Sequence, residues 1–249
     1  MIRIGIDVGS TYTKYCVMDE GAVITLSMDQ TPVRQSVFFE EKVRGLQGRY
    51  PDGEIISCGY GRSNVSAVKT INELTALAMG SFLASGKDGL VLDIGGQDTK
   101  LIEQRQGKLT RFFMNDKCAA GSGMFLMNTL RMLGVSFHDI DLTDVGQPKI
   151  RLSSVCAVFA QSEIVERIAD NESEMEIIHG VIWQIFVKAR ALLSKVYLRP
   201  LILSGGFSQI KGIEGFAGQA LGTECRILEN GAYLAAMGCA QGAVGGRNG

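Results

Sequence analysis

Alternating apolar and polar positions recur along the chain and predict β-strands in both halves. The expected strands cover residues 2–6, 12–19, 22–28, 54–58, 90–92, 98–104, 108–114 and 200–204. Elsewhere, apolar residues recur every three to four positions, which is the spacing of an amphipathic helix. The expected helices cover residues 65–83, 124–133, 157–169, 174–196 and 232–241. Strands interleaved with helices are typical of an α/β protein.

One short pattern occurs twice, each time after a predicted strand. Residues 7–14 and 93–100 both read D-[VI]-G-x-x-x-T-K. In each copy a strand leads into a glycine turn and a second strand returns from it. Two similar halves that each open with such a hairpin indicate a duplicated α/β architecture.

The duplication predicts two lobes. Gly and Ser interrupt the apolar pattern over residues 85–89, so we expect the chain to cross there from the first lobe to the second. The final helix should return to the first half. We therefore expect residues 1–86 plus 231–249 to form the first lobe and residues 87–230 the second. The glycine-rich tail, residues 242–249, is expected to fray.

Composition excludes several classes of function. The chain of 249 residues is 46% apolar and 20% charged, unlike a disordered protein. It has 25 Lys and Arg against 26 Asp and Glu, a net charge of −1, so it lacks the basic character of a nucleic-acid-binding domain. No run reaches the roughly 18 apolar residues of a membrane span, and the start has no signal-peptide layout. We expect a cytoplasmic protein that binds neither nucleic acid nor membrane.

The hairpins carry candidate phosphate chemistry. A glycine turn can direct successive backbone N–H groups and a hydroxyl at one anionic oxygen. Asp7 ends the preceding strand, where a carboxylate can hold Mg²⁺, and Asp93 would hold the metal or orient the attacking water. The binding residues expected in the turns are Gly9, Ser10, Thr11, Lys14, Gly95, Gly96 and Gln97. The alternative is a pair of unrelated glycine turns between buried strands.

A third glycine element follows the apolar strand near residue 204. Gly205 and Gly206 are expected to let the backbone pass close to a base or ribose, where the chain opens a helix. Residues 6–11, 92–96 and 204–206 together resemble the phosphate-1, phosphate-2 and adenosine motifs of the actin, sugar kinase and heat-shock chaperone superfamily. This resemblance implies a duplicated ribonuclease-H-like fold, with two lobes and a nucleotide cleft for ATP between them.

Two of the six cysteines stand in loops of small residues before predicted helices. Cys118 lies in the string N-D-K-C-A-A-G-S-G and Cys156 in S-S-V-C-A-V-F. The free N–H groups and dipole of a helix N-terminus favour a thiolate, and thiolates ligate metal. A [4Fe-4S] cluster needs four thiolates, so a twofold-symmetric homodimer would complete the set. The alternative for either residue is a small buried hydrophobe. The other cysteines are interpreted as packing residues: Cys16, Cys58, Cys225 and Cys239.

The string around Cys118 resembles the activator family of 2-hydroxyacyl-CoA dehydratases and the related ATPase subunits of benzoyl-CoA reductases (BadF/BadG/BcrA/BcrD type). The resemblance runs from Ile4 through Gly238. It implies that Cys118 and Cys156 ligate one [4Fe-4S] cluster shared across a homodimer.

The resemblance also implies a biochemical function. ATP would drive single-electron transfer at low potential from that cluster to a partner iron-sulfur dehydratase or reductase, such as a 2-hydroxyacyl-CoA dehydratase, with Mg²⁺ as a further cofactor. A ferredoxin or flavodoxin would be the electron donor. Gly121, in the same string as Cys118, and Glu163, seven residues after Cys156, are further candidates for nucleotide contact.

The chain also departs from the family's pattern. Leu77 stands where a histidine is usual, and Gln161 replaces a glutamate. Phe207 and Ile210 replace a smaller residue and an asparagine. These departures leave the adenosine contacts and the subfamily open, whereas the hairpins and the cysteine turns are complete.

Structural rather than catalytic roles are expected for the two histidines and the single tryptophan. His138 and His179 lack a partner at metal-binding spacing, so surface or capping roles are expected. Trp183 lies in an apolar stripe with helix-core spacing and is expected to pack in the core.

A small-molecule or sugar kinase of the same superfamily is the alternative function, and an actin-like filament protein is a second alternative. Neither accounts for the two cysteine turns.

Overall fold

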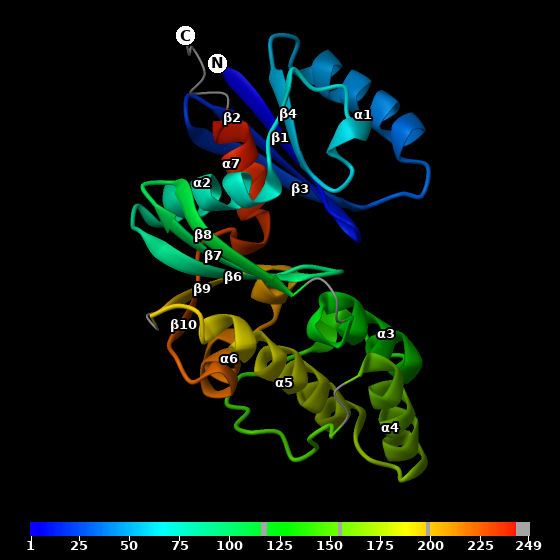
Figure 1. The fold of residues 1–249 in the computed structure, drawn as a ribbon. Helices are drawn as coiled ribbons and strands as arrows, with labels where there is room; N and C mark the ends of the chain where they lie inside the picture. The colour runs from blue at the N-terminus through cyan, green and yellow to red at the C-terminus, as the bar shows by residue number, and fades with distance from the viewer. Residues whose placement is uncertain (116–118, 154–155, 198–199, 243–249) are drawn as a thin grey trace. The chain divides into compact units, whose positions relative to one another are not determined.

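The computed structural model of the protein describes residues 1–115, 119–153, 156–197 and 200–242 (Figure 1). The chain divides into two compact units. Unit 1 comprises Met1–Gly89, Ile102–Phe112 and Leu228–Gly249, and unit 2 comprises Leu90–Leu101 and Phe113–Ile227. The lobe boundaries expected from the sequence stay a prediction. Among the described helices, none has both the length and the apolar character needed to cross a bilayer.

A five-stranded sheet in the order β3-β2-β1-β4-β5 forms the centre of unit 1. Its strands are β1 (Ile2–Val8), β2 (Tyr12–Asp19), β3 (Ala22–Gln30), β4 (Glu54–Gly59) and β5 (Lys69–Thr70). β1 runs antiparallel to β2 and parallel to β4. This register pairs Asp7 with Lys14 on one side and with Cys58 on the other.

The second sheet repeats the strand order of the first. It reads β10-β9-β6-β7-β8. β1 lies between β2 and β4, and β6 lies in the same way between β7 and β9. The strands are β6 (Gly89–Ile94), β7 (Thr99–Arg105), β8 (Lys108–Asn115), β9 (Leu201–Gly205) and β10 (Cys225–Ile227). Together with the helices, this shared topology confirms the predicted duplicated α/β fold. Every strand expected from the sequence is present to within two residues.

The helices of unit 1 are α1 (Gln35–Arg49), α2 (Glu73–Ser85) and α7 (Leu234–Gln241), with short turns η1 (Arg62–Asn64) and η5 (Gly231–Tyr233). The prediction that a helix begins at residue 65 was wrong. Lys69 and Thr70 instead pair with β4, and the Asn72 side chain caps α2 by accepting a hydrogen bond from the Leu74 N–H group at 2.8 Å. Helix α1 had no sequence signal because only Phe39 and Val43 of its residues are buried.

Helices α2 and α7 lie side by side in unit 1 (Figure 1). Glycines allow this close approach. A Cβ on Gly80 would collide with the carbonyl oxygen of Leu234, and one on Gly238 with that of Ala76. A Cβ on Gly5 of β1 would likewise collide with the carbonyl oxygen of Ala236. α7 therefore packs on both α2 and the sheet through backbone-to-backbone contact.

The helices of unit 2 are α3 (Gly123–Leu133), α4 (Ala157–Ala169), α5 (Glu174–Leu193) and α6 (Ile213–Leu221), with turns η2 (Ala119–Gly121), η3 (Phe137–Asp139) and η4 (Gly206–Gln209). The sequence predicted α3, α4 and α5 to within three residues. It missed α6, because Gly215 and Gly218 interrupt the apolar spacing of that short helix, and it missed β10.

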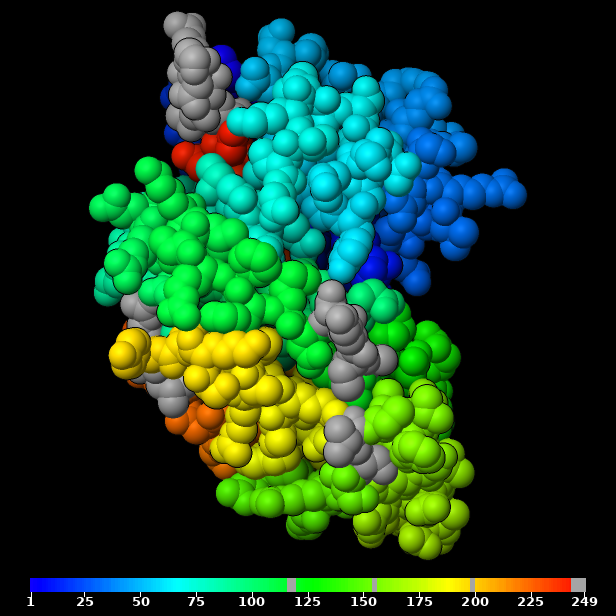
Figure 2. Space-filling view, in the orientation of Figure 1, coloured from blue at the N-terminus to red at the C-terminus, as the bar shows by residue number. Residues whose placement is uncertain are grey.

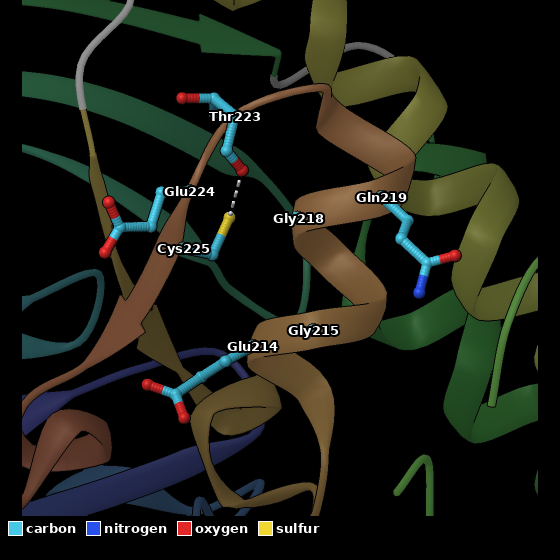
Figure 3. Close-up of a pocket in the computed structure, with 7 residues that line it drawn as sticks. All are labelled: Glu214, Gly215, Gly218, Gln219, Thr223, Glu224 and Cys225. Atoms are coloured by element: carbon cyan, nitrogen blue, oxygen red, sulfur yellow. Dashed lines mark hydrogen bonds between the residues drawn. The ribbon is translucent and has the colours of Figure 1, made fainter. Parts of the chain in front are cut away.

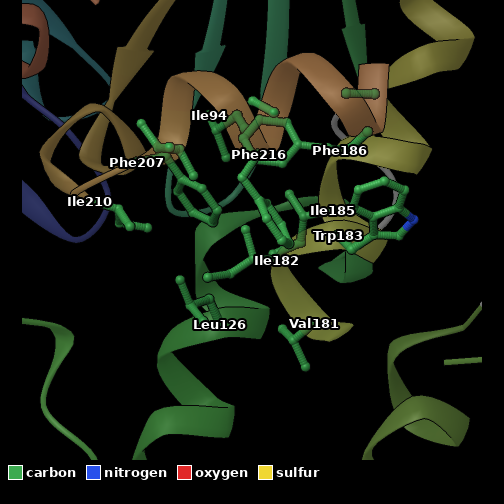
Figure 4. Packing of buried hydrophobic residues seen from close by; sticks show 14 of the residues in the cluster. Ile94, Leu126, Val181, Ile182, Trp183, Ile185, Phe186, Phe207, Ile210 and Phe216 are labelled. Atoms are coloured by element: carbon green, nitrogen blue, oxygen red, sulfur yellow. The ribbon is translucent and has the colours of Figure 1, made fainter. Parts of the chain in front are cut away.

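The core of unit 2 gathers around α5 (Figure 4). Trp183 makes an edge-to-face contact with Phe216 of α6 at 5.5 Å between ring centroids, which confirms its predicted packing role. The prediction of a surface or capping role for His179 was wrong, because its side chain is buried with its ring 6.3 Å from that of Phe216. His138 is exposed in η3, as predicted.

Candidate functional site

The first hairpin turn joins β1 to β2. Asp7 is 5% exposed at the end of β1, Ser10 is exposed, and a Cβ on Gly9 would lie 2.7 Å from the carbonyl oxygen of Tyr12. The Thr11 hydroxyl oxygen is buried without a hydrogen-bond partner. A buried hydroxyl costs free energy unless it is hydrogen-bonded. The turn therefore fits an anionic oxygen that would complete the hydrogen bonding of Thr11.

The end of β3 braces this turn. The Thr31 hydroxyl donates to the Gly9 carbonyl at 2.8 Å, and the Thr31 N–H group donates to the Thr11 carbonyl at 2.9 Å. The Thr13 hydroxyl lies 3.0 Å from that of Thr31 and shares a hydrogen bond with it. Both ends of the turn are thereby fixed to the neighbouring strand.

The second hairpin turn joins β6 to β7 and holds a buried ion pair. The Lys100 ammonium lies 3.0 Å from Asp98 Oδ1 and 3.9 Å from Asp93 Oδ2. A Cβ on Gly95 would lie 2.8 Å from Asp98 Oδ1, so a side chain there would displace the Asp98 carboxylate. Gln97 is exposed at the tip. Sequence reasoning missed Asp98 and Lys100, although the repeated T-K ending of the hairpin motif was the available signal for Lys100.

A glycine of the neighbouring parallel strand lies close to each of the two aspartates. Gly59 ends β4 with φ +88° and Gly205 ends β9 with φ +82°. A Cβ on Gly59 would collide with the Val8 carbonyl and stand 2.9 Å from Asp7 Oδ1. In unit 2, a Cβ on Gly205 would collide with the Ile94 carbonyl and stand 3.2 Å from Asp93 Oδ1. The two units thus build the same support beneath each carboxylate, and sequence reasoning had assigned a role only to Gly205.

Gly206 differs from Gly205, because a Cβ at that position would meet no atom within 4 Å. This open space beside the end of β9 is consistent with the prediction that the backbone here passes close to a base or ribose. The helix expected directly after the two glycines is instead the short turn η4, with α6 starting at Ile213.

The Cys58 thiol donates to Asp7 Oδ1 at 3.7 Å. A hydrogen bond with Cys239, together with burial, raises the pKa of Cys58 well above its ordinary value of 9.0. Burial likewise raises the pKa values of Cys16 and Cys225 to about 12. These thiols therefore stay protonated at neutral pH, which suits packing residues and disfavours metal ligation.

Cys156 is the one exposed cysteine within the ranges that the structure describes. It is the N-cap residue of α4, and its side chain makes no capping hydrogen bond. Cys118 lies outside the described residues. Over the described part of the chain, no group of three or more His, Cys, Asp and Glu side chains is arranged to hold a metal ion. The exposed thiol at a helix start nevertheless fits the donor chemistry of an iron-sulfur cluster that a second chain completes.

Glu163 lies on α4 and binds the segment before Cys156. Its carboxylate accepts hydrogen bonds from the Ser153 N–H group at 3.0 and 3.1 Å and from the Ser153 hydroxyl at 3.1 Å. Gly121, in η2, accepts a hydrogen bond from the Thr99 hydroxyl at 2.5 Å. The structure thus ties both residues to loops of unit 2, and their contact with a nucleotide stays a prediction.

A pocket of about 430 Å³ opens between α6 and β10 (Figure 3). The carboxyl groups of Glu214 and Glu224 stand at its edge, and Cys225 donates to the Thr223 carbonyl at 3.6 Å. None of the residues predicted from the sequence for a site lines it. Two carboxylates disfavour a phosphate there.

The fold and these paired turns define a protein of the actin and sugar kinase class, with two ribonuclease-H-like lobes. A glucokinase of Streptomyces griseus, 14% identical with a TM-score of 0.58 over 97% of this chain and 98% of its own, shares the fold. Residues 4–245 match the BadF/BadG/BcrA/BcrD ATPase family. The chain belongs to this family, and the resemblance identified from the sequence is confirmed.

Two relatives are similar over nearly their whole length. The activating ATPase of (R)-2-hydroxyglutaryl-CoA dehydratase from Acidaminococcus fermentans is 30% identical over 95% of both chains. The solved structure of the activator of 2-hydroxyisocaproyl-CoA dehydratase from Clostridium difficile, with bound ADPNP, is 26% identical with a TM-score of 0.87 over 100% of both chains.

Proposed function

We propose that the chain is an ATP-dependent activator that delivers single electrons at low potential to a partner iron-sulfur enzyme, such as a 2-hydroxyacyl-CoA dehydratase. The observation that carries the proposal is Cys156, an exposed thiol at the start of α4 within a family of ATPases. The names of the relatives support the activator role, because two of them are dehydratase activators.

Cys156 and Cys118 of each of two chains would hold one [4Fe-4S] cluster, which supplies the single low-potential electron when bound. The N-terminus of α4 places free N–H groups and the positive end of the helix dipole beside Cys156. Glu163 binds Ser153, which stands three positions before Cys156 in the sequence.

The nucleotide would bind to the two hairpin turns. Backbone N–H groups of the turns and the Thr11 hydroxyl would bind phosphate oxygens, while the Asp7 carboxylate would hold Mg²⁺. Asp93 would orient the attacking water for hydrolysis. Lys100 sits within 3.9 Å of Asp93 and keeps positive charge beside it.

A homodimer would bring the two pairs of thiols together. Helix α4 lies at the surface of unit 2 (Figure 2). It exposes four large apolar side chains along its length. These are Val158, Phe159, Val165 and Ile168. Exposed apolar side chains grouped on one helix mark an interaction surface, and a second copy of the chain is the occupant that would complete the cluster.

Variants at the cysteines test the proposal. In protein purified without oxygen, Cys118→Ala and Cys156→Ala should each lose iron while ADP binding, measured by calorimetry, is retained. Cys225→Ser is the matched control and should keep its iron, because this thiol is buried away from α4. Full iron in both alanine variants would contradict the proposal. An iron-free wild type that releases ADP only with a small-molecule substrate would favour a kinase.

A further inference from the structure

Two equivalent threonines of the repeated hairpin motif have different partners. Thr13 and Thr99 each stand six residues after the aspartate, and both are fully buried. The Thr13 hydroxyl meets Thr31 of unit 1, at the end of β3. The Thr99 hydroxyl instead donates at 2.5 Å to the carbonyl of Gly121, in η2. The same motif position therefore braces its turn to a strand in unit 1 and to η2 in unit 2.

Two backbone hydrogen bonds join the same parts of unit 2. The Gly123 N–H group donates to the Gly95 carbonyl at 2.8 Å, and the Met124 N–H group donates to the Gly96 carbonyl at 2.9 Å. Both donors belong to the first turn of α3, and both acceptors belong to the hairpin turn that joins β6 to β7. Three hydrogen bonds thus connect residues 95–99 with residues 121–124.

Peptide planarity makes these bonds sensitive to a ligand on the turn. The Gly95 carbonyl shares a rigid peptide plane with the N–H group of Gly96, and the Gly96 carbonyl shares one with the N–H group of Gln97. A phosphate that reorients these N–H groups must rotate the carbonyls in the same planes. The N–H groups of Gly123 and Met124 bind those carbonyls, so any rotation acts on the start of α3.

The connection continues toward α4. Turn η2, which carries Gly121, contacts both α4 and α5. Helix α4 begins directly after Cys156. A displacement of η2 therefore reaches the helix whose N-cap is Cys156, entirely within unit 2.

We propose that Thr99 is a positioning residue that couples the nucleotide turn at residues 95–97 to η2 and, through it, to α4. This inference rests on the proposed function, since it needs a nucleotide on that turn. Thr99 touches neither the reacting phosphate nor a metal in this assignment. Its hydrogen bond holds Gly121 next to the turn. The two backbone hydrogen bonds from the start of α3 then transmit a rotation of the turn to η2.

Hydrogen–deuterium exchange of the full chain, with and without ADP and Mg²⁺, tests the coupling. In the wild type, nucleotide should change the exchange of residues 119–133 and 157–169 by about fivefold, the lower end of common coupling strengths. Thr99→Val, which keeps the shape but removes the donor, should abolish the change in residues 157–169 without abolishing ADP binding. Thr99→Ser should restore it.

The matched control is Thr13→Val, the equivalent change in unit 1. It should weaken ADP binding and preserve the nucleotide effect on residues 157–169. A purely structural role for Thr99 would raise exchange with and without ADP alike, so a retained nucleotide effect in Thr99→Val overturns the inference. A wild type that binds ADP with no change in residues 157–169 also overturns it. A wild type that fails to bind ADP overturns the proposed function itself, together with this inference.

Discussion

Asp7 and Asp93 each face a glycine at the end of the neighbouring parallel strand. The positive φ of Gly59 and Gly205 and the missing Cβ leave room for the carboxylates and for the carbonyls next to them. Any larger residue would have to displace backbone atoms, which cannot move as a flexible side chain does. The position of the two aspartates therefore depends on residues from a different strand.

Gly59→Ala tests this support. The substitution combines a left-handed backbone cost of about 1–2 kcal/mol with overpacking of about 1–3 kcal/mol, so we expect a destabilisation of about 3 kcal/mol. Gly21→Ala is the control, because Gly21 has φ +89° but no atom within 4 Å of its Cβ position. It should cost about 1–2 kcal/mol. Urea denaturation measures both, and equal losses would contradict the predicted clash.

His179 should make stability depend on pH. Burial lowers the pKa of His179 below its ordinary value of 6.5, and Glu176 opposes that shift only partly. The unfolded chain then binds the proton at a higher pH than the folded chain. The free energy of unfolding should therefore fall as the pH drops below about 6.5 and should not change through this residue above that pH.

Thermal unfolding at pH 5.5 and 7.5 checks this effect. His179→Gln should show a smaller difference in melting temperature between the two pH values than the wild type. His138→Gln is the control, since His138 is exposed, and should keep the wild-type difference. An unchanged difference in His179→Gln would show that other groups cause the pH dependence.

At the scale of elements, sequence patterns worked where one face of a segment is apolar and failed where few residues are buried. Helices α4 and α5 were predicted because their apolar residues repeat at helical spacing. Helix α1 buries only Phe39 and Val43, so it left no such pattern. The start of α2 was misplaced because the pairing of Lys69 and Thr70 with β4 is a tertiary contact that local propensity does not encode.

The contact between α2 and α7 leads to a second stability prediction. Gly238→Ala places a methyl group against the Ala76 carbonyl of α2 and should destabilise the protein by about 3 kcal/mol, because two backbones must separate. Gly45→Ala is the control within α1, where a Cβ meets no atom within 4 Å. It should stabilise the protein by up to about 1 kcal/mol, since Ala favours a helix over Gly. Melting temperatures that shift in the same direction would contradict the packing.

At the scale of the whole molecule, the duplication was readable because the hairpin motif repeats in the sequence. The two sheets confirm it through their shared strand order. The sequence could not show how each hairpin is braced, because Thr31 and Gly121 reach the turns only through the tertiary fold. For the same reason, the sequence could not show that the Glu163 carboxylate binds Ser153, and the contact of Glu163 with a nucleotide stays a prediction.

The duplicated units also differ in what their hairpins connect to. The turn of unit 1 is bound to Thr31, directly after β3, whereas the turn of unit 2 is bound to Gly121, which lies in the same string as Cys118. In the proposed function, the turn of unit 1 would hold the nucleotide, and the turn of unit 2 would in addition transmit the presence of nucleotide to η2.

In the proposed function, two chains would share one [4Fe-4S] cluster through Cys118 and Cys156. Iron and acid-labile sulfide can be counted per dimer in protein purified without oxygen, with the visible spectrum recorded before and after dithionite. We expect about four irons and four sulfides per dimer, as one such cluster requires, and a broad absorption band that bleaches on reduction. A protein that contains no iron after anaerobic reconstitution would contradict the proposed function.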